Sequence, residues 1–191
     1  MSVFSIIKQR RSIDPDDFNG QLVDKHIIDE MLESANWAPT HGLTEPWRFV
    51  VITQEFLSDF GLFHADLFKQ KTAPEHFLEK KYNKIKNRSA LCSHVIICVN
   101  KRGNKTNIPE LEELAATSCA IENMLLVATA HHIGTFWSTG GMCYDADFKK
   151  HFGFDEQDQV MGILYIGHYD IPQPTGIRLT DWQDKVRYYP A

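Results

Sequence analysis

Long hydrophobic runs, paired cysteines and an excess of positive charge are all absent from this chain of 191 residues. No apolar run approaches the roughly 18–20 residues of a membrane-spanning helix, and the first apolar stretch is too short for a signal peptide. Twenty Lys and Arg against 25 Asp and Glu give a net charge of -5, without the basic stripe of a nucleic-acid binder. We therefore expect neither a membrane protein nor a nucleic-acid-binding protein.

Cysteine is scarce and forms no C-x-x-C pair. Free cysteine behaves as a small hydrophobic residue, so buried thiols in a reducing compartment are the main interpretation, and we expect a cytoplasmic protein. A zinc site or a disulfide framework is the alternative. The adjacent His131 and His132 point about 100° apart on a helix, which favours a solvated helix end over a metal site. The cysteines are Cys92, Cys98, Cys119 and Cys143.

Hydrophobic residues make up 43% of the chain, enough for a real core, and the length fits one domain over residues 1–191. Apolar spacing predicts helices over residues 2–10, 24–36, 54–70, 109–132 and 145–151. Apolar runs predict strands over residues 47–53, 95–100, 134–137 and 160–167. Helices come first and are then mixed with strands, without a regular βαβ alternation. This order indicates an α+β fold with a mixed sheet flanked by helices.

The predicted helix over residues 109–132 has Pro109 at its start and Gly134 just beyond its end. Its middle is apolar nearly all round, apart from Glu122 and Asn123. Such a helix is buried on most sides, either in the core or against a partner chain. Because a domain of this size has few such places, we expect this long helix to lie at a dimer interface.

No common catalytic motif is present: there is no nucleophile elbow, zinc-protease helix, P-loop or dinucleotide-binding fingerprint. Three segments suited to holding a ligand remain. The first is Arg10-Arg11-Ser12 at the end of the first predicted helix. Guanidinium groups bind phosphate bidentately and Ser adds a hydrogen bond, so the triplet suits a phosphate. Solvent-exposed arginines are the alternative.

The second segment is the loop from Ala38 to Phe49, in which two prolines and a glycine restrict the backbone. Thr40, His41 and Glu45 place polar groups on this loop, as in sites that orient a polar heterocycle. The third segment is the turn from Trp137 to Gly141, where glycines allow close approach and hydroxyls and N–H groups offer donors. Ordinary connections with no ligand are the alternative for both.

Residues 71–90 carry a local basic patch in an otherwise acidic chain. A solvated helix face is one interpretation, and a mobile cover that attracts an anionic ligand to the site mouth is the other. The basic residues are Lys80, Lys81, Lys84, Lys86 and Arg88.

Together, these segments resemble the flavin-dependent nitroreductase family, near its small single-domain bacterial members. Arg10-Arg11-Ser12 matches the family's R-R-S, and the stretch from Ala38 to Phe49 matches its A-P-[ST]-x-x-N-x-Q-P-W-R-F. The turn from Trp137 to Gly141 falls where the family has a strand-end turn on the flavin. Residues 162–168 resemble its last core strand, and Arg178 stands where a basic residue usually follows.

The resemblance implies a nitroreductase-like fold with the long helix in the interface of a homodimer that binds two FMN molecules. It implies that NADH or NADPH donates hydride to flavin N5 and that a nitroaromatic, quinone or similar small-molecule acceptor follows by a ping-pong mechanism. The flavin then carries the chemistry, so no catalytic side chain and no metal are expected. The positions implied are Arg10, Arg11, Ser12 and Arg178 at the phosphate and ribityl chain, Thr40, His41 and Glu45 along the isoalloxazine, and Trp137, Ser138, Thr139 and Gly140 against the flavin.

Two residues depart from the family pattern. Leu43 stands where the family often has Asn, and Glu45 stands where it usually has Gln. A carboxylate beside the ring would disfavour the anionic reduced flavin by like-charge repulsion, unless it is protonated or faces away. We expect His41 to bind the flavin rather than act as an acid. A dehalogenase-like flavin enzyme of the same fold and a non-enzymatic dimeric flavin-binding protein remain as alternatives.

Overall fold

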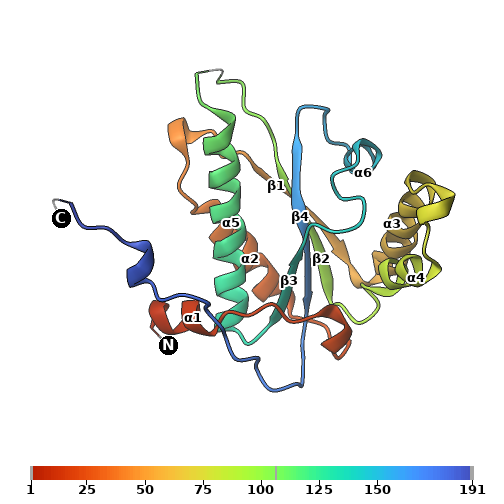
Figure 1. The fold of residues 1–191 in the computed structure, drawn as a ribbon, viewed down its shortest axis with the longest axis horizontal. Coiled ribbons are helices and arrows are strands. Elements are labelled where there is room, and N and C mark those ends of the chain that lie inside the picture. Colours follow the sequence, from red (N-terminus) through yellow and green to blue (C-terminus); the bar gives the residue numbers. More distant parts are fainter. Residues whose placement is uncertain (1, 106, 190–191) are drawn as a thin grey trace.

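A sheet of four strands runs through the middle of the part of the chain that the computed structural model describes, residues 2–105 and 107–189 (Figure 1). The strands are Trp47–Thr53 (β1), His94–Asn100 (β2), Gly134–Ser138 (β3) and Gln159–Gly167 (β4), in the spatial order β1-β2-β4-β3. All three pairings are antiparallel. The only parallel contact among the described residues is an isolated bridge between Ser12 and Thr135. The α+β prediction is confirmed, but the sheet is antiparallel rather than mixed, because apolar runs reveal strands and not their relative directions.

The helices are Val3–Gln9 (α1), Lys25–Asn36 (α2), Leu57–Lys71 (α3), Glu79–Asn87 (α4), Glu110–Ala130 (α5) and Ala146–His151 (α6), with short 3-10 turns between several of them. Each predicted helix is present close to its expected range, and a further helix, α4, forms within the basic segment over residues 71–90. The predicted helix over residues 54–70 begins with one such turn, Gln54–Phe56, before α3. Asp145 caps α6 by accepting a hydrogen bond from the Asp147 amide at 2.8 Å.

Strand β2 has a buried apolar core, and its side chains alternate between two helical layers. Ile96 and Cys98 belong to the core shared with α2 and α5, whereas Val95, Ile97 and Val99 belong to the core shared with α3 and α6. Helices therefore cover both faces of the sheet (Figure 1). This alternation explains why a continuous apolar run marked the strand.

Helix α5 is the longest helix and is buried along one face in this single chain. Small residues on that face, Ala116, Ala120 and Ala128, let α5 approach the sheet and α2 closely. Its outward side keeps apolar residues in solvent, and Leu111 is 75% exposed. A single chain therefore buries only part of the apolar surface of α5.

The cysteines are free thiols: Cys92, Cys98 and Cys143 are buried, and Cys119 on α5 is exposed. Residues 2–105 and 107–189 contain no cluster of His, Cys, Asp and Glu that could hold a metal. His131 instead pairs with Glu30 of α2 at 2.7 Å. Across the same residues, every helix is too short or too polar to cross a lipid bilayer.

The basic segment packs as α4 against α3, on the sheet face opposite α5 (Figure 1). Lys80, Lys81, Lys84 and Lys86 are exposed. Arg88 differs from them, because its guanidinium lies 4.7 Å above the Phe136 ring and 3.9 Å from Asp14. Arg88 is therefore part of the packed structure rather than of a charged surface.

Candidate functional site

The segment after α1 is tied to the start of β3. The amide of Ile13 donates to the carbonyl of Thr135 at 3.0 Å, next to the isolated bridge of Ser12 with Thr135. Since β3 leads directly into the Trp137–Gly141 turn, this pairing brings two distant sequence segments together. Arg10 and Ser12 consequently lie beside Trp137 and Thr139.

A cavity of about 340 Å³ opens where these segments meet, and we name it the Arg10 cavity. Its lining contains both polar and apolar residues. Across it, the Nε of Arg10 lies 3.4 Å from a carboxylate oxygen of Glu122 on α5. Both side chains are partly exposed, so this ion pair contributes little to the stability of the fold. The lining residues are Arg10, Ser12, Glu122, Leu125, Thr135, Trp137 and Thr139.

Trp137 is held against β4 by a hydrogen bond from its indole Nε1 to the carbonyl of Met161, at 2.9 Å. Gly162 makes this position possible. A Cβ on Gly162 would lie 2.5 Å from Trp137 Nε1, and its φ of +138° is strained for other residues. The glycine in the last strand therefore fixes the aromatic wall of the Arg10 cavity.

The turn after β3 is braced by its own side chains. The hydroxyl of Ser138 accepts the Gly140 amide at 3.3 Å, and the thiol of Cys143 donates to the Thr139 carbonyl at 3.0 Å. Burial raises the pKa of Cys143 to about 11, so the thiol keeps its proton and can donate. Thr139 and Gly140 remain exposed at the top of this turn, available to a ligand.

Arg11 and Arg178 lie in a different cavity, of about 790 Å³, between α1 and the C-terminal segment. Lys8 also lines it, and the Nε of Arg11 donates to the Pro174 carbonyl at 3.2 Å. We expected Arg10, Arg11 and Arg178 to meet at one phosphate, but in this chain Arg10 lines a separate cavity. The helix ends at Arg10, whose φ of -53° and ψ of 123° are not helical, so Arg10 and Arg11 do not follow one another along a helix face.

The Thr40–Glu45 loop lies at the other end of α5. His41 Nδ1 is 2.5 Å from a carboxylate oxygen of Glu112, in the first turn of that helix. The Thr40 hydroxyl pairs with Thr44 at 3.0 Å and accepts the Glu45 amide at 3.2 Å. Glu112 and Glu122 are ten residues apart, or about 15 Å along the helix axis. Within one chain, this loop and the Arg10 cavity are therefore separate.

The Thr40–Glu45 loop also stores backbone strain. Leu43 and Glu45, the two departures from the family pattern, both have positive φ, at 55° and 43°. Non-glycine residues in this region each cost on the order of 1 kcal/mol and tend to cluster at ligand sites. The Glu45 side chain is exposed, whereas its backbone carbonyl accepts from Arg48 at 2.8 Å.

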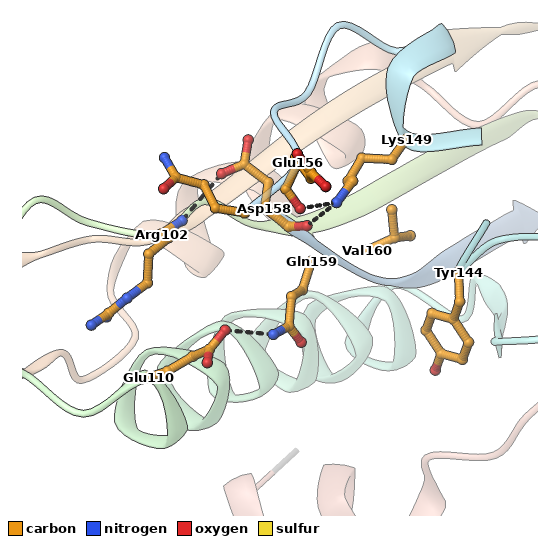
Figure 2. A pocket seen from close by; sticks show the side chains of 9 residues that line it. Arg102, Glu110, Tyr144, Lys149, Glu156, Asp158, Gln159 and Val160 are labelled. Atoms are coloured by element: carbon orange, nitrogen blue, oxygen red, sulfur yellow. Dashed lines mark hydrogen bonds between the residues drawn. The ribbon is translucent and has the colours of Figure 1, made fainter. Parts of the chain in front are cut away.

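A third cavity, of about 660 Å³, contains none of the predicted site residues, and we name it the Arg102 cavity (Figure 2). The Arg102 guanidinium pairs with the buried Glu113, and its backbone amide donates to Asp158 at 3.2 Å. Lys149 donates to the Asp158 carbonyl at 2.9 Å, and Gln159 donates to Glu110 at 2.5 Å. The charged groups are used by the chain itself, so this cavity is a structural feature.

Comparison with known proteins identifies the family of this chain. The family model described as Nitroreductase family matches residues 7–168. This chain belongs to the nitroreductase family. The matched range contains every predicted site residue except Arg178.

Relatives of this nitroreductase-family chain agree with that assignment, which places it in a family of oxidoreductases. It is 30% identical over 165 residues to YfhC of Bacillus subtilis (strain 168), named as a candidate NAD(P)H nitroreductase, covering 86% of this chain and 83% of YfhC. A nitroreductase-like protein from Bacillus cereus matches with a TM-score of 0.83 and 26% identity, over 100% of this chain and 97% of its own. A structure from Desulfovibrio desulfuricans in complex with FMN has a TM-score of 0.73 and 22% identity, over 100% and 98%.

Two polar residues near the site of this nitroreductase-family protein were not predicted from the sequence. Glu122 had a signal, because it is one of two polar residues in the otherwise apolar middle of α5. His64 had none, since it lies within a predicted helix among aromatic residues. The structure places His64 directly below the turn that follows β3, where its Nε2 accepts the Met142 amide at 3.2 Å.

Proposed function

We propose that this protein is an FMN-dependent NAD(P)H oxidoreductase that works as a homodimer and reduces nitroaromatics, quinones or similar electron-poor acceptors. The observation that carries the proposal is the Arg10 cavity, which joins the R-R-S segment to the turn after β3. The FMN complex of the Desulfovibrio desulfuricans structure, which has the same fold, also supports it. When bound, FMN would take hydride at N5 from NADH or NADPH and pass the reducing equivalents to the acceptor in a second half-reaction.

The groups in and beside the Arg10 cavity fit FMN in kind. Hydroxyls of Ser12, Thr135 and Thr139 suit a polyol chain, and the Arg10 guanidinium suits a phosphate. Lys8, Arg11 and Arg178 add positive charge across α1, which would raise the local concentration of anionic ligands. The Trp137 indole offers a flat apolar wall for an aromatic ring. In this arrangement Ser138 and Gly140 support the turn that faces the ring.

The homodimer is supported by apolar surface that one chain leaves uncovered. An apolar groove of about 360 Å³ runs between α1, α2 and α5, and Trp37 at its edge is 80% exposed. The C-terminal segment exposes Leu179 at 98% and Trp182 at 61%. Exposed apolar patches of this kind mark protein interfaces, and a second copy of this chain is the occupant we propose.

A homodimer would also complete the site. Because the Thr40–Glu45 loop is separated from the Arg10 cavity of its own chain along α5, we propose that it serves the cavity of the partner subunit. Thr40 and His41 would then line the ring, with His41 held by Glu112. We further propose that residues 1–191 act as one FMN-binding domain in the cytoplasm, where the buried thiols would stay reduced.

Steady-state kinetics tests the proposal. Initial rates with NADPH or NADH and menadione or nitrofurazone, measured at several fixed acceptor concentrations, should give parallel double-reciprocal lines. Parallel lines are expected because one site serves donor and acceptor in turn. Intersecting lines would contradict the shared site, and the absence of turnover in FMN-loaded protein would favour a flavin-binding protein without this activity.

A further inference from the structure

His64 of α3 is buried beneath the turn that follows β3. Only 3% of the residue is exposed, and its ring lies 5.8 Å from the ring centre of Phe60 and 5.4 Å from that of Phe148. Its Nε2 accepts the backbone amide of Met142 at 3.2 Å. An imidazole in aromatic surroundings therefore makes a direct hydrogen bond to the turn that bears Thr139 and Gly140.

The contact between the ring and the turn is close. Gly141 has a φ of +69°, and a Cβ at this position would lie 2.2 Å from His64 Nε2. No other side chain could occupy position 141 without moving the imidazole or the turn. The Thr139 carbonyl is held from the same region by Cys143. The turn is thus held at Met142 by His64 from the layer beneath and at Thr139 by a side chain of its own segment.

The protonation state of His64 follows from this bond. Because Nε2 accepts, the neutral ring carries its proton on Nδ1, and Nδ1 is buried without a hydrogen-bond partner among the described residues. Burial, together with the charge of Arg88, lowers the pKa of His64 to about 4, so the ring is neutral near pH 7. A Leu or Phe would fill this apolar place without an unpaired N–H. The bond to Met142 gives a reason for a histidine here.

We propose that His64 is a positioning residue of the flavin site, holding the Thr139–Met142 turn from below so that Thr139 keeps its place in the lining of the Arg10 cavity. This inference rests on the proposed function, because it assigns the turn to the flavin. His64 itself does not line the Arg10 cavity and is buried, so its action on a ligand passes through the backbone of the turn.

The test compares His64→Gln with His64→Leu. The side-chain carbonyl of Gln can take the place of Nε2 as acceptor, whereas Leu cannot accept. The Kd for FMN, from quenching of flavin fluorescence, should rise about tenfold in His64→Leu and stay within about threefold in His64→Gln. Phe60→Leu is the matched control, because Phe60 touches the ring and makes no hydrogen bond to the turn. It should leave the Kd for FMN unchanged.

Hydrogen exchange of the Met142 amide gives a readout that does not need FMN. Its protection should be lost in His64→Leu and kept in His64→Gln. Equal protection in both variants and the parent protein would overturn the inference, as would equal FMN affinities. If the parent protein fails to bind FMN, the proposed function fails, and Met142 exchange still shows whether His64 fixes the turn.

A glycine pair covers the case in which His64→Leu does not fold. Gly141 and Gly153 have similar φ values, +69° and +75°, but a Cβ at Gly153 meets nothing within 4 Å. Gly141→Ala should raise the Kd for FMN about tenfold, and Gly153→Ala should leave it unchanged. Equal Kd values in these two variants would contradict the close contact between His64 and the turn.

Discussion

The Arg10 cavity and the Arg102 cavity are each lined by an arginine that pairs with a glutamate of α5, yet they differ in what the pair does. Glu113 is 1% exposed and is held by Arg102 and by the Gly103 amide at 3.3 Å. Glu122 is partly exposed and meets Arg10 at 3.4 Å. The Arg102–Glu113 pair is largely buried and belongs to the packed structure, whereas the Arg10–Glu122 pair is partly exposed to solvent.

The difference shows why we place the proposed flavin site by the partners of the charged groups and not by cavity size. The Arg102 cavity is the larger of the two, but Arg102, Lys149 and Glu110 already bond to other groups of the chain. Figure 2 shows the bonds of Lys149 and Glu110. The Arg10 cavity is smaller and is lined by residues with hydroxyl groups and by the partly exposed Arg10–Glu122 pair. If this contrast is correct, substitutions in the first cavity change stability, and substitutions in the second change ligand affinity.

Arg102→Ala gives the largest expected effect. It leaves the Glu113 carboxylate buried without its cation, which should lower the free energy of unfolding by about 3–5 kcal/mol. Urea denaturation followed by circular dichroism measures the loss, and the Kd for FMN should not change below the transition. A loss under about 1 kcal/mol would break the contrast, because it would mean that Arg102 is not essential to the fold.

Acid pH should destabilise the fold through His64. Its pKa is about 4 in the fold against 6.5 for the free residue, so the unfolded chain binds more protons between these values. The stability due to neutral His64 is complete above pH 6.5 and falls as the pH drops toward 4, by roughly 3 kcal/mol in total. Urea denaturation across this range should show a smaller decline for His64→Gln. Equal declines would show that His64 titrates normally.

Arg10→Ala should change affinity more than stability. Loss of its charge-assisted hydrogen bonds should raise the Kd for FMN about 10–100-fold, whereas the free energy of unfolding should fall by less than about 1 kcal/mol. Fluorescence quenching measures the Kd for FMN, and urea denaturation measures the free energy of unfolding. Lys25→Ala, which removes an exposed pair with Asp29 on α2, is the control and should alter neither. A stability loss as large as that of Arg102→Ala would erase the distinction between the cavities.

Replacing Lys80, Lys81, Lys84 and Lys86 together with Ala should have the smallest effect. These side chains are exposed on α4, and none of them lines the Arg10 cavity. The KM for NADPH should change less than about twofold at low and at high salt, as expected for a solvated helix face. A ratio of variant KM to parent KM that rises steeply as salt is lowered would instead support the alternative of a basic cover at the site mouth.

Much of the fold could be predicted from local patterns. The apolar residues of α2 and α5 are strong signals because their buried positions recur at helical spacing, and the apolar runs of β2 and β4 are strong signals because these strands are buried along nearly their whole length. Strand direction could not be predicted, since Ile96 and Val95 alternate in the same way in parallel and antiparallel sheets. The antiparallel order depends on the connections between strands, which carry no such period.

For the candidate site, the sequence indicated several residues of the cavity lining but not how they are arranged. Arg10, Ser12, Trp137 and Thr139 meet in one cavity because the backbone at Thr135 pairs with the segment after α1. Separation of Arg11 from Arg10 depends on backbone angles at the end of α1, which the triplet does not reveal. His64 could not be found because its role comes from contacts with Gly141 and Met142, about eighty residues away in the sequence.

Anaerobic absorbance spectroscopy of the FMN-loaded protein tests the central claim most directly. Addition of NADH or NADPH should bleach the flavin band near 450 nm, and addition of menadione should restore it, while Arg10→Ala should need a higher FMN concentration to give the same signal. A band that stays unchanged with both donors, in protein that has bound FMN, would contradict the proposed NAD(P)H-dependent reductase.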